Sequence, residues 1–559
     1  MERVGTRLGV GCFACLPGED LDFEEALEYI RKHPCDDFMH KYLLHLTGTF
    51  GPNLVDMLID RGKKDDPHLL ALMYETCILN ERLQALRKRF DGIHVKELAE
   101  YTPLIYIRWF LRKNRGQRLY WPTLFSENIC RHIPLPSPKH LKYSVPFDRG
   151  AIEAWKARVV TIEDLFSECG QKVSPRGAMP KPAPQETARR AMRGLKTCDL
   201  IAGPEMETQA SISPCALLMP WRLDVAVSTG RNRWRLSGIQ VSYGKGLNIH
   251  EARASYLMEM VERCSAFASF NSDGIPGYKK CYPLIKAAHK DLATRGHNAL
   301  DPNDMNLEVP YENQELYWIP AERAGENECH PIYVPAQLVF LFCNLDEISL
   351  TSGLPSNGLA AGNTLEEAKL NALLEVIERD AERVMPYSRE RCFLLESEDP
   401  GVRDILEGCR KDGIHVQFLD ITPEFGIPCY KAFIQGPRGE IFKGCGAGLD
   451  GKRAVVSALT EVPYSCQHQV GSMPAPEGIM TMKYEGLPDY ASGDVAQDLR
   501  LLERLLITNG YHPIYVDLTR ADLDIPVARA VVPGLEMITD FDRFSGLSIR
   551  QFAHSRYCR

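Results

Sequence analysis

Apolar residues recur with helical spacing in two segments of the chain, residues 246–263 and 362–379. The segments GLNIHEARASYLMEMVER and GNTLEEAKLNALLEVIER align without a gap, share their apolar register, and both end on the pattern Glu-x-x-Glu-Arg. Positions three, four and seven residues apart share one helix face. Each segment therefore predicts a helix with one apolar side and one acidic side.

The hydrophobic pattern divides the rest of the chain into a helical first part and a mixed second part. Helical stripes run from Asp22, where Glu25 is placed for a capping box, to about residue 100. A proline-rich stretch follows, and short β-rich runs then alternate with helices, for example at residues 430–434 and 514–517. We expect an α/β (α+β) domain over 196–540, in which the paired acidic helices lie on a sheet. We also expect an all-α N-terminal domain over 1–170 that recognises a substrate or partner, a linker over 171–195, and a short polar tail over 541–559.

Composition limits the function classes. Lys and Arg number 66 against 74 Asp and Glu, a net charge of −8, which argues against a general nucleic-acid binder. A basic and aromatic stretch at residues 82–118 would suit an acidic peptide or RNA, or else form a solvated helix face over buried aromatics. No run of 18 apolar residues is present, so no membrane span is expected.

Cysteine usage indicates the compartment. The 18 cysteines are scattered without a pairing pattern, which is typical of reduced thiols in a cytoplasmic protein. Cys12 and Cys15 form a single CxxC pair. Without a second pair, a metal half-site and ordinary packing both stay open.

The acidic faces of the two expected helices pose an electrostatic problem. Glu259 and Glu262 lie on one helix, and Glu375 and Glu378 on the other. Carboxylates brought together repel and raise one another's pKa values. Mg²⁺ binds carboxylate oxygens together with substrate phosphates, and would relieve this repulsion. The bland alternative is a pair of amphipathic surface helices with charge pairs four residues apart.

Residues around these acids suit a phosphate ligand. Arg263 and Arg379 follow the acids and could bind phosphate oxygens with two parallel hydrogen bonds. Glycine-rich segments precede both helices, at Gly244–Gly246 and at Gly358 and Gly362, and would let backbone N–H groups approach phosphates. The sequence therefore predicts a Mg²⁺–nucleotide site.

The same segments resemble the ATP-binding motifs of the YcaO superfamily, SxxxExxER at Ser255–Arg263 and SNGLAAGNTLEEAKLNALLEVIER at Ser356–Arg379. The flanking sequences GKGL (244–247), WIPA (318–321) and VDLTRADLDIPVARAVVPGLE (516–536) agree, so the resemblance covers about residues 195–537. It implies an ATP- and Mg²⁺-dependent enzyme that phosphorylates a backbone amide oxygen of a peptide or protein. A neighbouring side chain would then form an azoline, or an external sulfur donor a thioamide.

Residue by residue, the resemblance implies two ligand sets and leaves the catalytic residue unknown. The metal set is Glu259, Glu262, Glu367, Glu375 and Glu378, and the nucleotide set is Ser255, Arg263, Asn363, Asn371 and Arg379. To the nucleotide set we add Lys245 as a phosphate contact. A third family element, usually ALTEAAQSR, here reads ALTEVPYSC (458–466), in which Pro463 would disturb a helix.

The end of the chain, SRYCR, lacks the Pro-rich tail of azoline-forming members and favours the thioamide branch. The partners expected from the resemblance are a peptide or protein substrate, a TfuA-like protein or sulfur donor, and a second copy in a homodimer. Two alternatives stay open, an azoline-forming cyclodehydratase and a non-catalytic ATP-binding accessory factor in sulfur transfer or methylthiolation.

Overall fold

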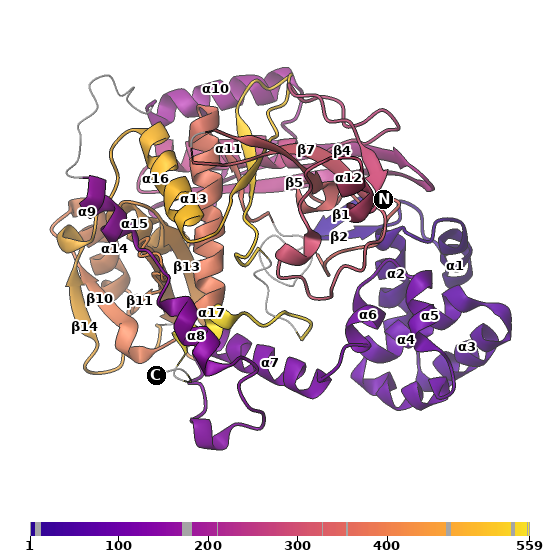
Figure 1. Cartoon of the computed structure of the whole chain (residues 1–559). Helices are drawn as coiled ribbons and strands as arrows, with labels where there is room; N and C mark the ends of the chain where they lie inside the picture. The colour runs from indigo at the N-terminus through magenta and orange to yellow at the C-terminus, as the bar shows by residue number, and fades with distance from the viewer. Residues whose placement is uncertain are drawn as a thin grey trace.

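The computed structural model describes residues 2–5, 13–169, 182–208, 211–326, 328–353, 356–464, 471–537, 543–555 and 557. The described residues form three mixed or antiparallel sheets with covering helices, and a group of N-terminal helices that lies at the lower right of Figure 1. The expected fold class, a mixed α/β region preceded by helices, is confirmed. Within these described ranges, no helix is both long and apolar enough to cross a bilayer.

The N-terminal helices have a hydrophobic core of their own, centred on α4, which is buried on nearly every side. They are α1 (Phe23–Lys32), α2 (Asp37–Gly48), α3 (Pro52–Asp65), α4 (Pro67–Leu79), α5 (Val95–Leu98) and α6 (Tyr106–Phe110). Asp22 and Glu25 form the expected capping box at α1. Two residues of the basic and aromatic stretch contact the later part of the chain: Arg108 donates to the Ser349 carbonyl, and the buried Trp109 donates to the Phe544 carbonyl.

The first sheet has the strand order β2-β1-β5-β4-β3. Its strands are β1 (Glu2–Gly5), β2 (Phe13–Leu16), β3 (Met206–Glu207), β4 (Cys215–Thr229) and β5 (Asn232–Gly246). Side chains on β4 and β5 alternate between buried and exposed, and the buried face packs under α11 (Ile249–Ala266). The strands β1 and β2 correct the expectation that residues 1–170 are all helical.

The linker expected over residues 171–195 is wrong for its second half. Residues Pro184–Thr197 form helix α10, which packs against α11, and residues 170–181 lie outside the described ranges. Pro184 does not exclude a helix here, because a proline at the first helical position loses no hydrogen bond. The remaining domain boundaries stay a prediction.

The third sheet, with order β6-β7-β15-β16-β9 and β8 on β7, carries the long helix α13 (Leu365–Val384) and α16 (Val495–Thr508). Its strands are β6 (Ile285–Ala287), β7 (Leu316–Arg323), β8 (His330–Pro335), β9 (Leu359–Ala361), β15 (Ile514–Asp517) and β16 (Val527–Val531), with α12 (His289–Thr294) after β6. Helix α13 runs through the middle of Figure 1, and α11 also touches β9 and β16. Both acidic helices therefore meet this sheet.

The second sheet, β13-β12-β11-β10-β14, lies on the other side of α13. Its strands are β10 (Cys392–Glu396), β11 (Gln417–Asp420), β12 (Cys429–Gln435), β13 (Ile441–Ala447) and β14 (Met480–Lys483). Helices α14 (Pro400–Lys411) and α15 (Gly451–Thr460) belong to this part, and α15 packs on β12 and β13. The hairpin β12–β13 faces α13 and so borders the acidic helices.

The C-terminal segment is buried, which corrects the expectation of a polar tail. Helix α17 (Ile549–His554) packs with α7 (Arg115–Arg131) and α8 (Arg149–Lys156), and Phe552 is fully buried. Helix α9 (Ile162–Cys169) follows α8 in the chain. Arg550 is 2% exposed, and its guanidinium donates to Asp380 and Glu424 at 2.6 Å each. The polar residues are buried because they are paired, which composition alone does not reveal.

Candidate functional site

The two acidic helices start from the same local arrangement, a strand followed by a glycine, a polar cap and the helix. Asn248 caps α11, and Glu251 Oε2 accepts a hydrogen bond from the Leu247 N–H at 3.0 Å. Thr364 caps α13, and Glu367 accepts hydrogen bonds from the backbone and side chain of Asn363. The sequence repeat is therefore also a structural repeat.

The glycines before these helices, which we expected to let the backbone approach phosphates, have a packing role. A Cβ on Gly244 would lie 2.1 Å from the Ala252 carbonyl oxygen, and one on Gly362 would lie 2.4 Å from the Ala368 nitrogen. Real Cβ atoms do not come so close, so only glycine lets the strand approach the helix. The glycines thereby bring the helices close to their sheets.

Four carboxylates from the two helices form one electrostatic group. Burial raises the pKa of Glu262 well above its usual value, and the neighbouring charges of Glu375 and Glu259 raise it further. The pKa values of Glu259 and Glu375 are also raised, chiefly by burial. Burial, together with Glu375, raises that of Glu378 to about 7 against the opposing effect of Arg379. Helix periodicity placed two acids on one face of each helix, and the structure brings these four acids into one electrostatic group.

Three arginines partly balance this charge. Arg263 lies 3.6 Å from Glu259 and 3.4 Å from Glu262, and Arg379 lies 3.3 Å from Glu378. The third, Arg529 on β16, is fully buried, and burial lowers its pKa to about 10 despite the charges of Glu375 and Glu262. Sequence reasoning missed Arg529, although an arginine inside the apolar run VARAVV was a visible signal.

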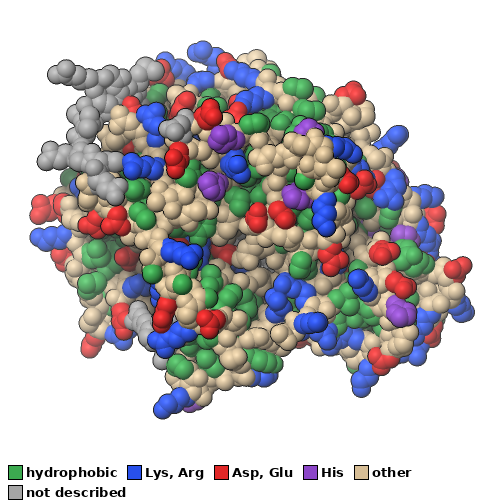
Figure 2. Space-filling model, in the orientation of Figure 1, with side chains coloured by type: hydrophobic (Ala, Val, Ile, Leu, Met, Phe, Trp, Pro, Cys, Tyr) green, Lys and Arg blue, Asp and Glu red, His purple; other side chains and the backbone are tan. Residues whose placement is uncertain are grey.

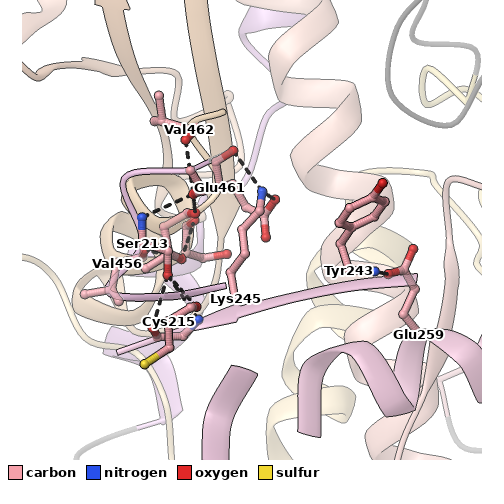
Figure 3. Close-up of polar contacts among 12 residues, drawn as sticks. Ser213, Cys215, Tyr243, Lys245, Glu259, Val456, Glu461 and Val462 are labelled. Atoms are coloured by element: carbon pink, nitrogen blue, oxygen red, sulfur yellow. Dashed lines mark hydrogen bonds and ion pairs between the residues drawn. The ribbon is translucent and has the colours of Figure 1, made fainter. Parts of the chain in front are cut away.

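Strand β5 contributes two further contacts, shown in Figure 3. The Tyr243 N–H donates to Glu259 Oε2 at 2.9 Å, so the strand backbone fixes one acid. Lys245 donates from Nζ to Glu461 Oε2 at 2.8 Å and to the Glu461 carbonyl at 3.2 Å. Glu461 follows α15 directly, in the third family element, so Pro463 lies beyond the helix and does not break it. The phosphate contact predicted for Lys245 stays a prediction, and here Lys245 binds this glutamate.

The remaining predicted residues lie at the edges of the group. Ser255 is exposed on α11, and Asn371 donates to the Ala361 carbonyl at 3.4 Å. Glu367 lies about 12 Å along α13 from Glu375, given the rise of ~1.5 Å per residue, and is engaged by Asn363. The structure therefore does not bring Glu367 into the four-acid group. Asn363 also accepts a hydrogen bond from Thr187 of α10 at 3.1 Å, a residue hidden in the supposed linker.

The residue set fits a Mg²⁺–nucleotide complex better than a bare ion. Among the described residues, no three His, Cys, Asp or Glu side chains converge as a complete metal cage. Mg²⁺ needs only one or two carboxylates when phosphates and water supply its other ligands. The raised pKa values, caused chiefly by burial, mean that ionising these acids is unfavourable in the nucleotide-free protein. A cation carried by a nucleotide would supply compensating charge.

The comparison with protein families agrees with this chemistry. The model described as YcaO cyclodehydratase, ATP- and Mg²⁺-binding, matches residues 243–473 and 464–536, more than half of the chain. The protein is thus of the ATP- and Mg²⁺-binding class, which confirms the cofactors expected from the sequence. It belongs to the YcaO family.

Two curated relatives are uncharacterised proteins. One, from Methanothermobacter thermautotrophicus, is 30% identical over 339 residues, covering 54% of this chain and 83% of its own. The other, from Rhizobium leguminosarum bv. trifolii, is named for its place in the tfuA 3′ region and is 27% identical over 222 residues, covering 33% of this chain and 52% of its own.

Solved structures of similar chains include a heterocyclase in complex with substrate and cofactor, with a TM-score of 0.49 and 20% identity. That match covers 69% of this chain and 60% of the heterocyclase. YcaO from Methanopyrus kandleri, bound with AMPPCP and Mg²⁺, has a TM-score of 0.47 and 24% identity over 65% of this chain and 94% of its own.

Proposed function

We propose that this protein is an ATP- and Mg²⁺-dependent enzyme that exchanges the oxygen of a peptide or protein backbone amide for sulfur. The observation that carries the proposal is that carboxylates of α11 and α13 raise one another's pKa values and lie beside Arg263 and Arg379. Such a group suits a cation bound to a polyphosphate.

ATP supplies a phosphoryl group that makes the amide oxygen a leaving group. Hydrosulfide from a sulfur donor then adds to the amide carbon, the carbon–oxygen bond breaks, and the oxygen departs with inorganic phosphate. The products are a thioamide, ADP and phosphate. The chain's residues act by positioning and by neutralising charge, since acids hold the metal side and arginines the phosphate side.

A TfuA-like partner forms part of the proposal. The name of the Rhizobium relative places it in the tfuA 3′ region, which supports a protein of that kind as the source or carrier of sulfur. The N-terminal helices α1–α6, with their separate core, would recognise the substrate or this partner. We further propose a homodimer, which light scattering of the purified protein would test.

An azoline-forming cyclodehydratase is the second candidate function, because the family description names that activity. There the nucleophile is a side chain of the substrate, and the product has lost one water. A non-catalytic ATP-binding accessory factor in sulfur transfer or methylthiolation is the third, and would leave the mass of the peptide unchanged by this protein alone.

Calorimetry with Mg²⁺–ATP tests the site. The wild-type protein should bind, and Glu259→Gln combined with Glu375→Gln should abolish binding while circular dichroism shows a retained fold. Glu366→Gln, on the exposed side of the same helix α13, is the matched control and should bind normally. Tight binding by the double variant would refute the site.

Mass spectrometry tests the reaction. Peptides from cells that make the wild-type protein, a TfuA-like partner and a sulfide source should contain backbone amides with sulfur in place of oxygen. Cells with the double variant should lack them. Peptides that have lost water would instead favour the cyclodehydratase.

A further inference from the structure

Two lysines on the β12–β13 hairpin converge on helix α13 next to the acidic group. Lys431 and Lys443 share one hairpin face, since Lys431 is opposite Cys445 and Lys443 is opposite Phe433 in the register. Both contact Oε1 of Glu382, Lys431 with its Nζ at 3.7 Å and Lys443 in an ion pair. Glu382 lies one helical turn after Glu378.

The same carboxylate reaches an arginine predicted to bind phosphate. Glu382 Oε2 lies 3.6 Å from a terminal nitrogen of Arg379, whose other terminal nitrogen lies 3.3 Å from Glu378. One carboxylate therefore holds Lys443 on one oxygen and Arg379 on the other.

This cluster has more positive than negative charge. Burial acts to raise the pKa of Glu382, but Lys443, Lys431 and Arg379 outweigh it and hold the pKa far below its usual value. Glu382 is thus one full negative charge among three cations. On the adjoining turn, Glu378 is one of the four acids of the acidic group, and it lies 3.3 Å from Arg379.

Basic side chains grouped beside a group of carboxylates are complementary to a metal-bound polyphosphate. The metal ion would sit on the carboxylates, and the phosphate oxygens would face the ammonium and guanidinium groups. Charge complementarity therefore points to phosphate, rather than to a side chain of the protein, as the group that completes the cluster.

The two lysines differ in their access to such a ligand. The Lys431 side chain is 1% exposed and its Nζ donates to the Ile129 carbonyl at 3.2 Å, which fixes it in the interior. The side chains of Lys443 and Arg379 are 35% and 36% exposed. An ammonium group has three donors, so Lys443 keeps donors beyond its pair with Glu382.

We propose that Lys443 is a phosphate-binding residue of the nucleotide site, and that Glu382 is the positioning residue that holds Lys443 and Arg379 around it. This rests on the proposed function, namely that a Mg²⁺–nucleotide binds between α11 and α13. Lys431 contributes a fixed buried charge that keeps Glu382 ionised and in place.

Calorimetry with two probes tests the role of Lys443. Lys443→Met should weaken the affinity for Mg²⁺–AMPPCP about tenfold or more and leave that for AMP, which lacks the β- and γ-phosphates, unchanged. Lys443→Arg should restore most of the affinity, because it keeps the charge. Lys483→Met, an exposed lysine on β14, is the matched control and should bind both probes as the wild-type protein does.

The outcomes separate this inference from the proposed function. If the wild-type protein fails to bind Mg²⁺–AMPPCP, the proposed function fails and the inference with it. If the wild-type protein binds and Lys443→Met binds equally well, only the inference fails. Equal weakening for both probes would also overturn it, because that result indicates a structural role.

A second measurement tests the positioning role of Glu382. Glu382→Gln should weaken Mg²⁺–AMPPCP binding, and adding Lys443→Met should cause little further loss, because the two residues act through one contact. Fully additive losses would refute that role. Since Glu382→Gln leaves Lys431 buried without its carboxylate, the combination with Lys431→Met removes both charges and keeps the test available if the single variant does not fold.

Discussion

The acidic group should make the nucleotide-free protein less stable as the pH rises from about 5 to about 8. Glu378 shows this most directly, because its pKa rises from 4.5 to about 7 in the folded protein and its side chain is only 14% exposed. Below pH 4.5 the carboxyl is protonated in both folded and unfolded states. Between the two pKa values the unfolded state ionises first, so folding loses free energy with rising pH until about pH 7.

The size of the effect follows from the pKa values. A tenfold change in a proton equilibrium corresponds to ~1.4 kcal/mol, so a rise from 4.5 to about 7 corresponds to about 3 kcal/mol at pH 8. Glu378→Gln has no carboxyl group to ionise and should therefore be spared this penalty. Mg²⁺–ATP should stabilise the wild-type protein most at the high end of the range, where the acids are ionised.

Thermal unfolding of the wild-type protein, Glu378→Gln and the exposed control Glu366→Gln, measured across this pH range, checks the reasoning. The melting temperature of Glu378→Gln should rise relative to the wild-type protein between pH 5 and pH 8, and that of the control should follow the wild-type curve. Parallel curves for the wild-type protein and Glu378→Gln would refute the claim that burial and neighbouring acids make the ionisation of Glu378 unfavourable.

Two further substitutions test the supports of the site. Arg550→Met removes the arginine that pairs with the buried carboxylates of Asp380 and Glu424, and leaves Glu424 only His554 as an ionic partner. It should lower stability by roughly 3–5 kcal/mol, seen in the melting temperature, whereas Arg438→Met at a surface pair should change it little. An unchanged melting temperature for Arg550→Met would contradict a stabilising ion pair between Arg550 of α17 and Asp380 of α13. Gly244→Ala places a Cβ 2.1 Å from the Ala252 carbonyl oxygen and should abolish nucleotide binding in calorimetry, whereas Gly408→Ala, with open space around it, should be neutral. Normal binding by Gly244→Ala would show that the strand–helix contact does not set the site.

Much of the site could be predicted from the sequence because it depends on residues that are close together in the chain. Helix periodicity placed Glu259 with Glu262, and Glu375 with Glu378, and the structure brings these four together as one electrostatic group. The caps at Asn248 and Thr364 belong to the same readable class, since a cap depends on residues three or four positions apart.

Contacts between distant segments were not readable. For Lys245 we predict a phosphate contact, but no local pattern indicates its pairing with Glu461, which is 216 residues away in the chain. Thr187 lies in the segment that we expected to be a linker, and its contact with Asn363 joins α10 to the start of α13. Proline content describes local backbone preference and says nothing about what a segment packs against.

Sequence alone predicts the two amphipathic helices, their four acids and, through the resemblance, the family. The side chains that support those acids and balance their charge become apparent only in the folded chain. Arg550 in an apparently polar tail, Arg529 inside an apolar strand, and the lysines around Glu382 all act on helices that lie far away in sequence. The physical reason is that a helix face is set by spacing within one segment, whereas the pairing of a buried charge depends on which segments the fold brings together.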